Sequence, residues 1–264
     1  MKKIIYLLLT IITFQINAQD FEVSPIDINF NAEPGDMQSK IITIKNHSNK
    51  KTGYLLAVQD YLVNKSGKTG FLDANATRNS IANWISISPS YVEIAPNGEQ
   101  TVQVSLQAPL DDYTAKWGAI SVSPAIERTA FSADGRLSAG VGVSGSIIIK
   151  LYQSPTSNQN HRAKISNLKE ITIEGDTVRT FTANIDNIGD KITECKVFLI
   201  AANLETAEER QFDPIKIKTY PKTARLIELK MPKVLPDGKY ALSAILDYGS
   251  NSELEGTQMI ITVP

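Results

Sequence analysis

The chain contains 264 residues, of which 42% are hydrophobic and 21% charged, and its formal net charge is −1. This balance, with no dense lysine or arginine stretch, excludes nucleic acid and anionic membrane surfaces as expected partners. A single cysteine, Cys195, excludes an intramolecular disulfide.

The first 18 residues have the pattern of a secretory signal peptide. Two lysines precede an apolar run over 4–14, and Ala18 stands before the polar pair Gln19 and Asp20. The run is too short for a transmembrane helix, which needs about 20 residues. We therefore expect cleavage after Ala18 and a mature protein in the periplasm or at the cell surface. The alternative is an uncleaved N-terminal anchor.

The first half of the mature chain is predicted to form short strands. Apolar and polar residues alternate along them, and turns containing glycine or proline separate them. The expected strands cover residues 21–30, 40–45, 54–63, 84–88, 91–94, 100–106, 117–122 and 141–152. One helical turn is expected within 73–83, and a mobile polar loop is expected over 123–140.

A second set of strands follows a polar segment, 153–163, that contains Pro155 and has no apolar periodicity. The expected strands of this half cover residues 165–173, 178–185, 191–201, 215–218, 224–230, 240–246 and 259–263. In this half, only residues 205–210 favour a helix, and that stretch is short.

Many short strands with little helix are typical of β-sandwiches or barrels. The prediction is therefore an all-β chain with two immunoglobulin-like β-sandwich domains in tandem. The expected boundaries are 1–18 for the signal peptide, 19–152 for the first domain, 153–163 for the linker and 164–264 for the second domain.

The sequence carries no recognisable catalytic chemistry. The usual zinc-binding, phosphate-binding and nucleophile-elbow motifs are missing, and the two histidines fall in a predicted turn and in the linker. We expect no enzyme activity, no catalytic residue, no metal and no cofactor. Cys195 is in phase with Val197 and Leu199, which predicts a buried and unreactive thiol.

Several segments in the first half resemble the periplasmic pilus-assembly chaperones of the PapD-like, chaperone–usher family. The first is Ile42 to Asn46 followed by Ser48-Asn49, and the second is Trp84 to Pro89 with Ile94 to Gly98. Trp117 to Pro124 is the third. The most specific is Ile149-Lys150-Leu151-Tyr152-Gln153-Ser154-Pro155, which is similar to the end of the family's long last strand.

The resemblance implies that this last strand adds itself to an incomplete sandwich of an exported client, such as a pilin-like or surface protein. Val141 and Val143 would then fill client pockets, and Ile147 and Ile149 would bind the client further along the strand. Lys150 would bind the client's terminal carboxylate. The ordinary alternatives are that Lys150 is a solvated lysine at a strand end and that the valines belong to the core.

This chain departs from the family pattern at two positions. Asp27 occupies the approximate place of an arginine that the family pairs with the lysine, and a carboxylate there would repel the ligand. Gly145 stands where a third apolar pocket filler is expected.

We expect an exported or cell-envelope protein as partner, no small-molecule substrate, and membrane contact only through partners. The layout also resembles bacterial extracellular immunoglobulin-like modules, so a structural envelope adaptor is the alternative function. An adaptor would cover the 141–150 edge and expose an apolar patch elsewhere.

Overall fold

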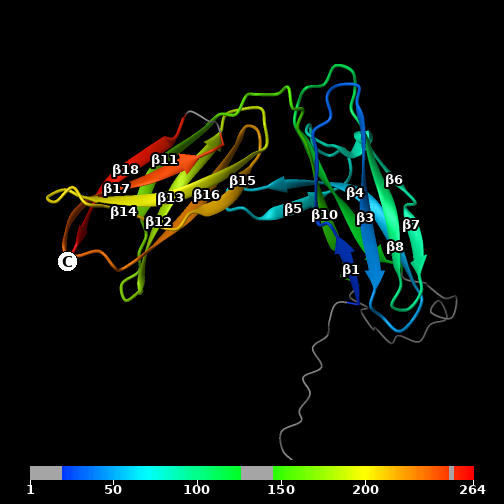
Figure 1. The fold of residues 1–264 in the computed structure, drawn as a ribbon, viewed down its shortest axis with the longest axis horizontal. Helices are drawn as coiled ribbons and strands as arrows, with labels where there is room; N and C mark the ends of the chain where they lie inside the picture. Colours follow the sequence, from blue (N-terminus) through cyan, green and yellow to red (C-terminus); the bar gives the residue numbers. More distant parts are fainter. Residues whose placement is uncertain (1–19, 126–144, 250–252) are drawn as a thin grey trace, which may run out of the picture.

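A computed structural model describes residues 20–125, 145–249 and 253–264. It is built almost entirely of strands, which form two β-sandwich domains side by side (Figure 1). The prediction of two sandwiches is therefore confirmed. The predicted signal peptide, together with Val141 and Val143, lies outside the described residues.

The described part of the first sandwich holds ten strands and one short 3-10 helix. They are β1 (Phe21–Ser24), β2 (Asp27–Phe30), β3 (Met37–Asn46), β4 (Thr52–Val63), β5 (Thr69–Leu72), η2 (Ala82–Trp84), β6 (Ile85–Ser88), β7 (Tyr91–Ile94), β8 (Glu99–Gln107), β9 (Lys116–Pro124) and β10 (Ile147–Gln153). One sheet has the order β1-β3-β8-β6, and the other has the order β2-β10-β9-β4-β5 with β7 also paired to β4.

The chain crosses between these two sheets near its start. β1 pairs antiparallel with β3, and after Pro25 and Ile26 the chain continues as β2, which pairs parallel with β10 in the opposite sheet. Apolar side chains at alternate positions of both sheets meet between them and form one core, which includes Ile42, Ile120 and Leu151.

Among residues 163–249 and 253–264, the second sandwich holds eight strands. They are β11 (Ala163–Glu170), β12 (Val178–Asn187), β13 (Thr193–Asn203), β14 (Glu209–Gln211), β15 (Ile215–Thr219), β16 (Thr223–Pro232), β17 (Gly238–Asp247) and β18 (Glu255–Val263). The sheet β11-β12-β16 faces a sheet of order β14-β13-β17-β18, in which β15 also pairs with β13. A second, separate core fills this sandwich and includes Phe181, Leu199 and Leu242.

A buried asparagine ends one strand in each domain. The Asn46 amide group donates to the carbonyl groups of Lys50, Ile94 and Ala95 at 2.8–3.2 Å, which fixes the loop after β3. At the end of β12, Asn187 donates to the Lys191 carbonyl at 2.9 Å. Each asparagine satisfies main-chain groups that the turn would otherwise bury without partners.

The structure differs from the sequence-based prediction at residues 205–210, where no helix forms. Two main-chain N–H groups, those of Glu205 and Thr206, donate to the Asn203 side-chain oxygen, and Ala207 has φ of 60°. These features make a turn that leads into β14. The expected helical turn before Trp84 is observed only as the 3-10 helix Ala82–Trp84.

The strand expected over 141–152 is also shorter in its described part. It begins at Ile147, because Gly145 and Ser146 are not in strand conformation. β9 continues to Pro124, so Ser123 and Pro124 are strand residues, and residues 126–140 of the expected loop lie outside the described residues. Across the described ranges, no helix has the length and apolar character required to cross a membrane.

Candidate functional site

Strand β10 has one side that is only partly covered. All seven of its residues pair with β9, whereas β2 pairs only with Lys150–Gln153 on the other side. The Lys150 N–H donates to the Ile26 carbonyl at 2.8 Å, so the main-chain groups of Lys150 face β2. Because main-chain groups alternate in direction along a strand, those of Ile148 face the same side. Within the described part of the chain, no strand pairs with this side of Ile147–Ile149.

The predicted client-binding side chains divide between the two faces of β10. Ile149 is fully buried in the core of its own domain, and Ile147 is half-buried against that core. Lys150 is half-buried on the opposite face, and Ile148 on that face packs near the contact with the second domain. The structure thus places Lys150 apart from Ile147 and Ile149, although the three lie within four residues.

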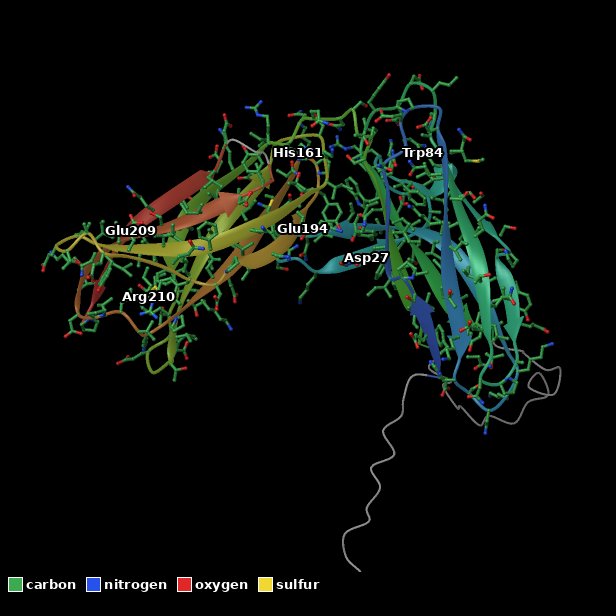
Figure 2. All side chains as sticks on the ribbon, viewed as in Figure 1. Asp27, Trp84, His161, Glu194, Glu209 and Arg210 are labelled. Carbon is green, nitrogen blue, oxygen red and sulfur yellow. The ribbon has the colours of Figure 1, made fainter. Side chains whose placement is uncertain are left out.

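Lys150 lies at the side of the first sandwich that faces the second domain. Its Nζ is 5.8 Å from the centre of the Tyr61 ring, close enough for a cation–π attraction. Asp27 is directly opposite Lys150 across the parallel β2–β10 ladder and is exposed. In Figure 2, Asp27 is labelled on the side of the first sandwich that faces the second domain. The acid that the sequence places near Lys150 is therefore its neighbour in the fold.

Aromatic side chains from both domains meet beside Lys150. Tyr61, Trp117 and Tyr152 come from the first sandwich and Tyr220 from the second, and all four are buried. The Tyr61 and Tyr220 hydroxyl oxygens are 3.0 Å apart, and the Trp117 Nε1–H donates to the Tyr61 carbonyl at 3.1 Å. Burial raises the pKa of the Tyr61, Tyr152 and Tyr220 hydroxyls, so all three stay protonated at neutral pH.

The second domain adds a lysine to the same place. Lys218 on β15 holds its Nζ 3.5 Å from the centre of the Tyr152 ring. Burial lowers the pKa of the Lys218 ammonium group, while the negative charges of Asp27 and Glu194 oppose that effect. Asn29, Ser154 and Glu194 line a cavity of about 190 Å³ next to Lys218. A short polar recess thus lies between the domains.

A hairpin of the first domain also contacts the second. The turn between β4 and β5 reaches toward β16, as Figure 1 shows, and the Leu226 N–H donates to the Lys65 carbonyl at 2.8 Å. Gly67 in this turn has φ of 86°, and a Cβ atom there would overlap the Arg225 guanidinium group. The contact covers part of the outer edge of β16, a place where an unpaired strand can otherwise associate with other chains.

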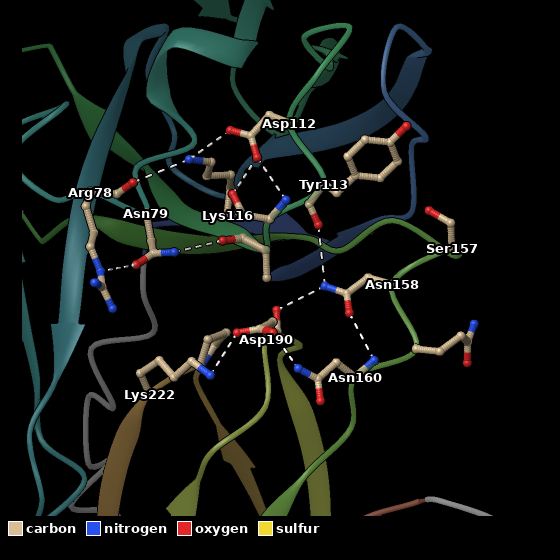
Figure 3. Close-up of a pocket in the computed structure, with 14 residues that line it drawn as sticks. Arg78, Asn79, Asp112, Tyr113, Lys116, Ser157, Asn158, Asn160, Asp190 and Lys222 are labelled. Carbon is tan, nitrogen blue, oxygen red and sulfur yellow. Dashed lines mark hydrogen bonds and ion pairs between the residues drawn. The ribbon is translucent and has the colours of Figure 1, made fainter.

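A cavity of about 900 Å³ lies between the two domains, lined by residues of both and of the linker (Figure 3). Four of its charged side chains form two ion pairs. Lys116 lies 3.1 Å from Asp112, and Lys222 lies 2.9 Å from Asp190. The Asn158 amide group donates to the carbonyls of Tyr113 and Asp190 and so links the two domains. These contacts hold the linker in place.

Cys195 is fully buried, as predicted, and burial raises the pKa of its thiol to about 11. Its Sγ contacts the Thr219 hydroxyl oxygen at 3.7 Å. Within residues 20–125, 145–249 and 253–264, no group of three or more His, Cys, Asp or Glu side chains is arranged to hold a metal ion.

The sequence did not reveal Tyr61, Tyr220 or Lys218 as parts of this site. Each lies in or next to a predicted strand, but their meeting depends on how the two domains dock. Alternation along a strand indicates which face a side chain occupies, not what lies across from that face. The aromatic character of Tyr61 and Tyr220 was the only available signal.

The sequence matches no protein-family model and no curated protein. Solved structures of chaperones align with most of this chain. The class 5 fimbriae chaperone CfaA is 10% identical with a TM-score of 0.47, and the match covers 92% of this chain and 99% of that chain. The Pseudomonas aeruginosa CupB2 chaperone is 10% identical with a TM-score of 0.39, covering 92% and 100%. A chain of the complex between the Salmonella enterica SafA pilin and the SafB chaperone is 10% identical with a TM-score of 0.43, covering 90% and 96%.

Proposed function

We propose that this chain is an exported, non-enzymatic, chaperone-like protein that holds a protein client outside the cytoplasm by β-strand addition. The client class is a pilin-like or surface protein. We also propose that residues 1–18 are removed and that the mature protein acts in the periplasm or at the cell surface. Its two domains would then cover residues 19–152 and 164–264, with the linker 153–163 between them.

The observation that carries the proposal is the uncovered side of β10 before Lys150. The β2 ladder stops at Lys150, so the main-chain groups of Ile148 face outward without a neighbouring strand among the described residues. A client strand can pair with such groups, gaining main-chain hydrogen bonds that do not depend on its sequence. An edge of this kind is otherwise a liability that proteins cover or shorten.

Lys150 supports the same proposal, because it stands where the uncovered edge enters the space between the domains. Its ammonium group would bind the terminal carboxylate of the client and so fix the register of the added strand. Val141 and Val143 would fill client pockets. Ile147 and Ile149, whose side chains face the core, would contribute by holding the edge in place for pairing.

Proline substitution tests the edge directly. Ile148→Pro removes the N–H that faces the uncovered side, whereas Ile148→Val keeps it and serves as the matched control. We expect the mature Ile148→Pro protein to recover at least about tenfold less client from the envelope fraction than the wild type. Ser146→Pro, which lies before the first residue of β10, provides a second variant if Ile148→Pro fails to fold.

Equal recovery by the proline and valine variants would contradict strand addition. Recovery of a fixed, non-exchanging envelope complex by all variants would instead identify a structural adaptor. To distinguish a chaperone from an adaptor, unlabelled protein is added to a complex purified with labelled protein. The release of the labelled protein from the complex is then measured.

A further inference from the structure

The ammonium groups of Lys150 and Lys218 approach one aromatic cluster from opposite domains. Lys150 Nζ lies 5.8 Å from the Tyr61 ring centre, and Lys218 Nζ lies 3.5 Å from the Tyr152 ring centre. Tyr152 is two residues after Lys150 on the same strand, so both side chains are on one face. The two positive charges are thus neighbours, although their positions in the chain are 68 residues apart.

Two like charges held close together repel unless an anion lies near them. Asp27 is opposite Lys150 on the β2–β10 ladder, and Glu194 is opposite Lys218 on the β13–β15 ladder. Figure 2 labels Asp27 on the first sandwich and Glu194 on the second, on the sides that face each other, and the charges of both act on Lys218. Of the charges acting on Lys218, that of Asp27 has the largest stabilising effect on its ammonium group.

Each lysine lies over an aromatic ring but has no acidic side chain in ion-pair contact within the described part of the chain. Among the described residues, the ion pairs within 4.0 Å involve neither Lys150 nor Lys218. Asp27 is exposed, so it can move aside at low cost. Both ammonium groups therefore retain donor capacity for a ligand, because each carries three N–H groups.

We propose that Lys218 is the second cation of the carboxylate site that Lys150 begins, so that the site is completed only across the two domains. The inference rests on the proposed function and deepens it. Asp27 is the resident counter-ion of the two lysines, and an arriving terminal carboxylate takes its place. An acid on β2 is then compatible with carboxylate binding, because the second cation comes from β15.

This arrangement predicts a preference for strands that end in a free carboxylate. An amidated end cannot replace Asp27 electrostatically, since it carries no charge. It also makes the site depend on the distance between the sandwiches, which the Tyr61–Tyr220 hydrogen bond helps to fix.

The test uses the mature protein labelled with ¹³C in its lysines and an acetylated hexapeptide of alternating threonine and valine. The peptide is prepared once with a C-terminal carboxylate and once with a C-terminal amide. Lysine ε-methylene signals are followed by NMR and assigned with Lys150→Arg and Lys218→Arg. The signals of both lysines are expected to shift with the acid peptide, and both shifts should follow one saturation curve. The amide peptide should bind about tenfold more weakly.

Three variants refine the result. Lys218→Ala should weaken binding of the acid peptide about tenfold and leave the amide peptide unchanged. Lys216→Ala, an exposed lysine of the same strand, is the matched control and should change neither. Asp27→Asn should strengthen binding of the acid peptide, because the competing charge is gone.

The outcomes separate this inference from the proposed function. A shift at Lys150 alone, which Ile148→Pro abolishes, would overturn the role of Lys218 and leave strand addition intact. Shifts at both lysines that survive in Ile148→Pro would support the two-domain site and contradict strand addition. No shift at either lysine would overturn the site altogether.

Discussion

The Tyr61 hydroxyl oxygen lies 3.0 Å from the Tyr220 hydroxyl oxygen, and this hydrogen bond joins the two sandwiches at the buried centre of their contact. Trp117 packs against Tyr220 with 5.0 Å between the ring centres. The Tyr152 hydroxyl interacts with both tyrosines. The position of the second domain beside β10 therefore depends on a small group of polar contacts inside an aromatic cluster.

Tyr61→Phe is expected to weaken the domain contact. The substitution keeps the ring but removes a buried hydrogen bond, at a cost of about 1–2 kcal/mol in the free energy of unfolding. Urea unfolding measures that cost. Tyr113→Phe, at an exposed tyrosine, is the control and should change it by less than about 0.5 kcal/mol. Equal effects at the two positions would rule out a special role for the buried pair.

Gly67→Ala is expected to loosen the β4–β5 turn from β16. Alanine is strained at φ of 86°, and its Cβ would overlap the Arg225 guanidinium group. Hydrogen exchange at the Leu226 amide, which donates to Lys65, should become faster. Gly70→Ala is the matched control, since open space surrounds that position. Slow exchange at Leu226 in the Gly67→Ala variant would contradict a contribution of the turn to docking.

Cys195 is expected to resist thiol reagents in the folded protein at pH 8, and to react fully in denaturant. Burial raises the pKa of the thiol from 9.0 to about 11, so the folded state binds the proton more tightly than the unfolded state does. The stability from this difference is fully present below pH 9 and is lost as the pH rises toward 11. Cys195→Ala should remove this component of the pH dependence. Rapid labelling without denaturant would show that the thiol is accessible.

Lys150→Ala is expected to weaken client binding by more than about tenfold without unfolding the protein, because the client's terminal carboxylate loses a charged partner. Binding is measured with purified client, and folding by circular dichroism. Lys40→Ala, an exposed lysine on β3 in the opposite sheet, is the control. Unchanged affinity would exclude the anchoring role.

Most of the fold was predictable because each strand buries one face. The alternation of Val102, Val104 and Leu106 places three buried side chains on one side of β8, and the phase of Cys195 with Val197 and Leu199 places the thiol in the second core. Period-two patterns of this kind are local in sequence, so no knowledge of the partner strands was needed.

The sequence did not predict the turn at 205–210 or the contact between Lys218 and Tyr152. The first has a local cause, and the second depends on residues far apart in the sequence. The helix expected at 205–210 fails because the Asn203 side chain accepts main-chain hydrogen bonds that a helix would use differently. The contact between Lys218 and Tyr152 depends on how the two domains dock, and the sequence pattern of a single strand does not indicate this. Lys150 and Asp27 were identified from the sequence because the family resemblance indicated their positions, whereas the resemblance indicated nothing about Lys218.

The most direct test of strand addition is the hydrogen exchange of the Ile148 amide, followed by NMR with and without purified client. Its N–H faces the uncovered side of β10, so exchange should be fast in the free protein. Client binding should slow it by at least about a hundredfold, while the Ile149 amide, which faces β9, changes much less. Bound client with unchanged exchange at Ile148 would contradict strand addition at this edge.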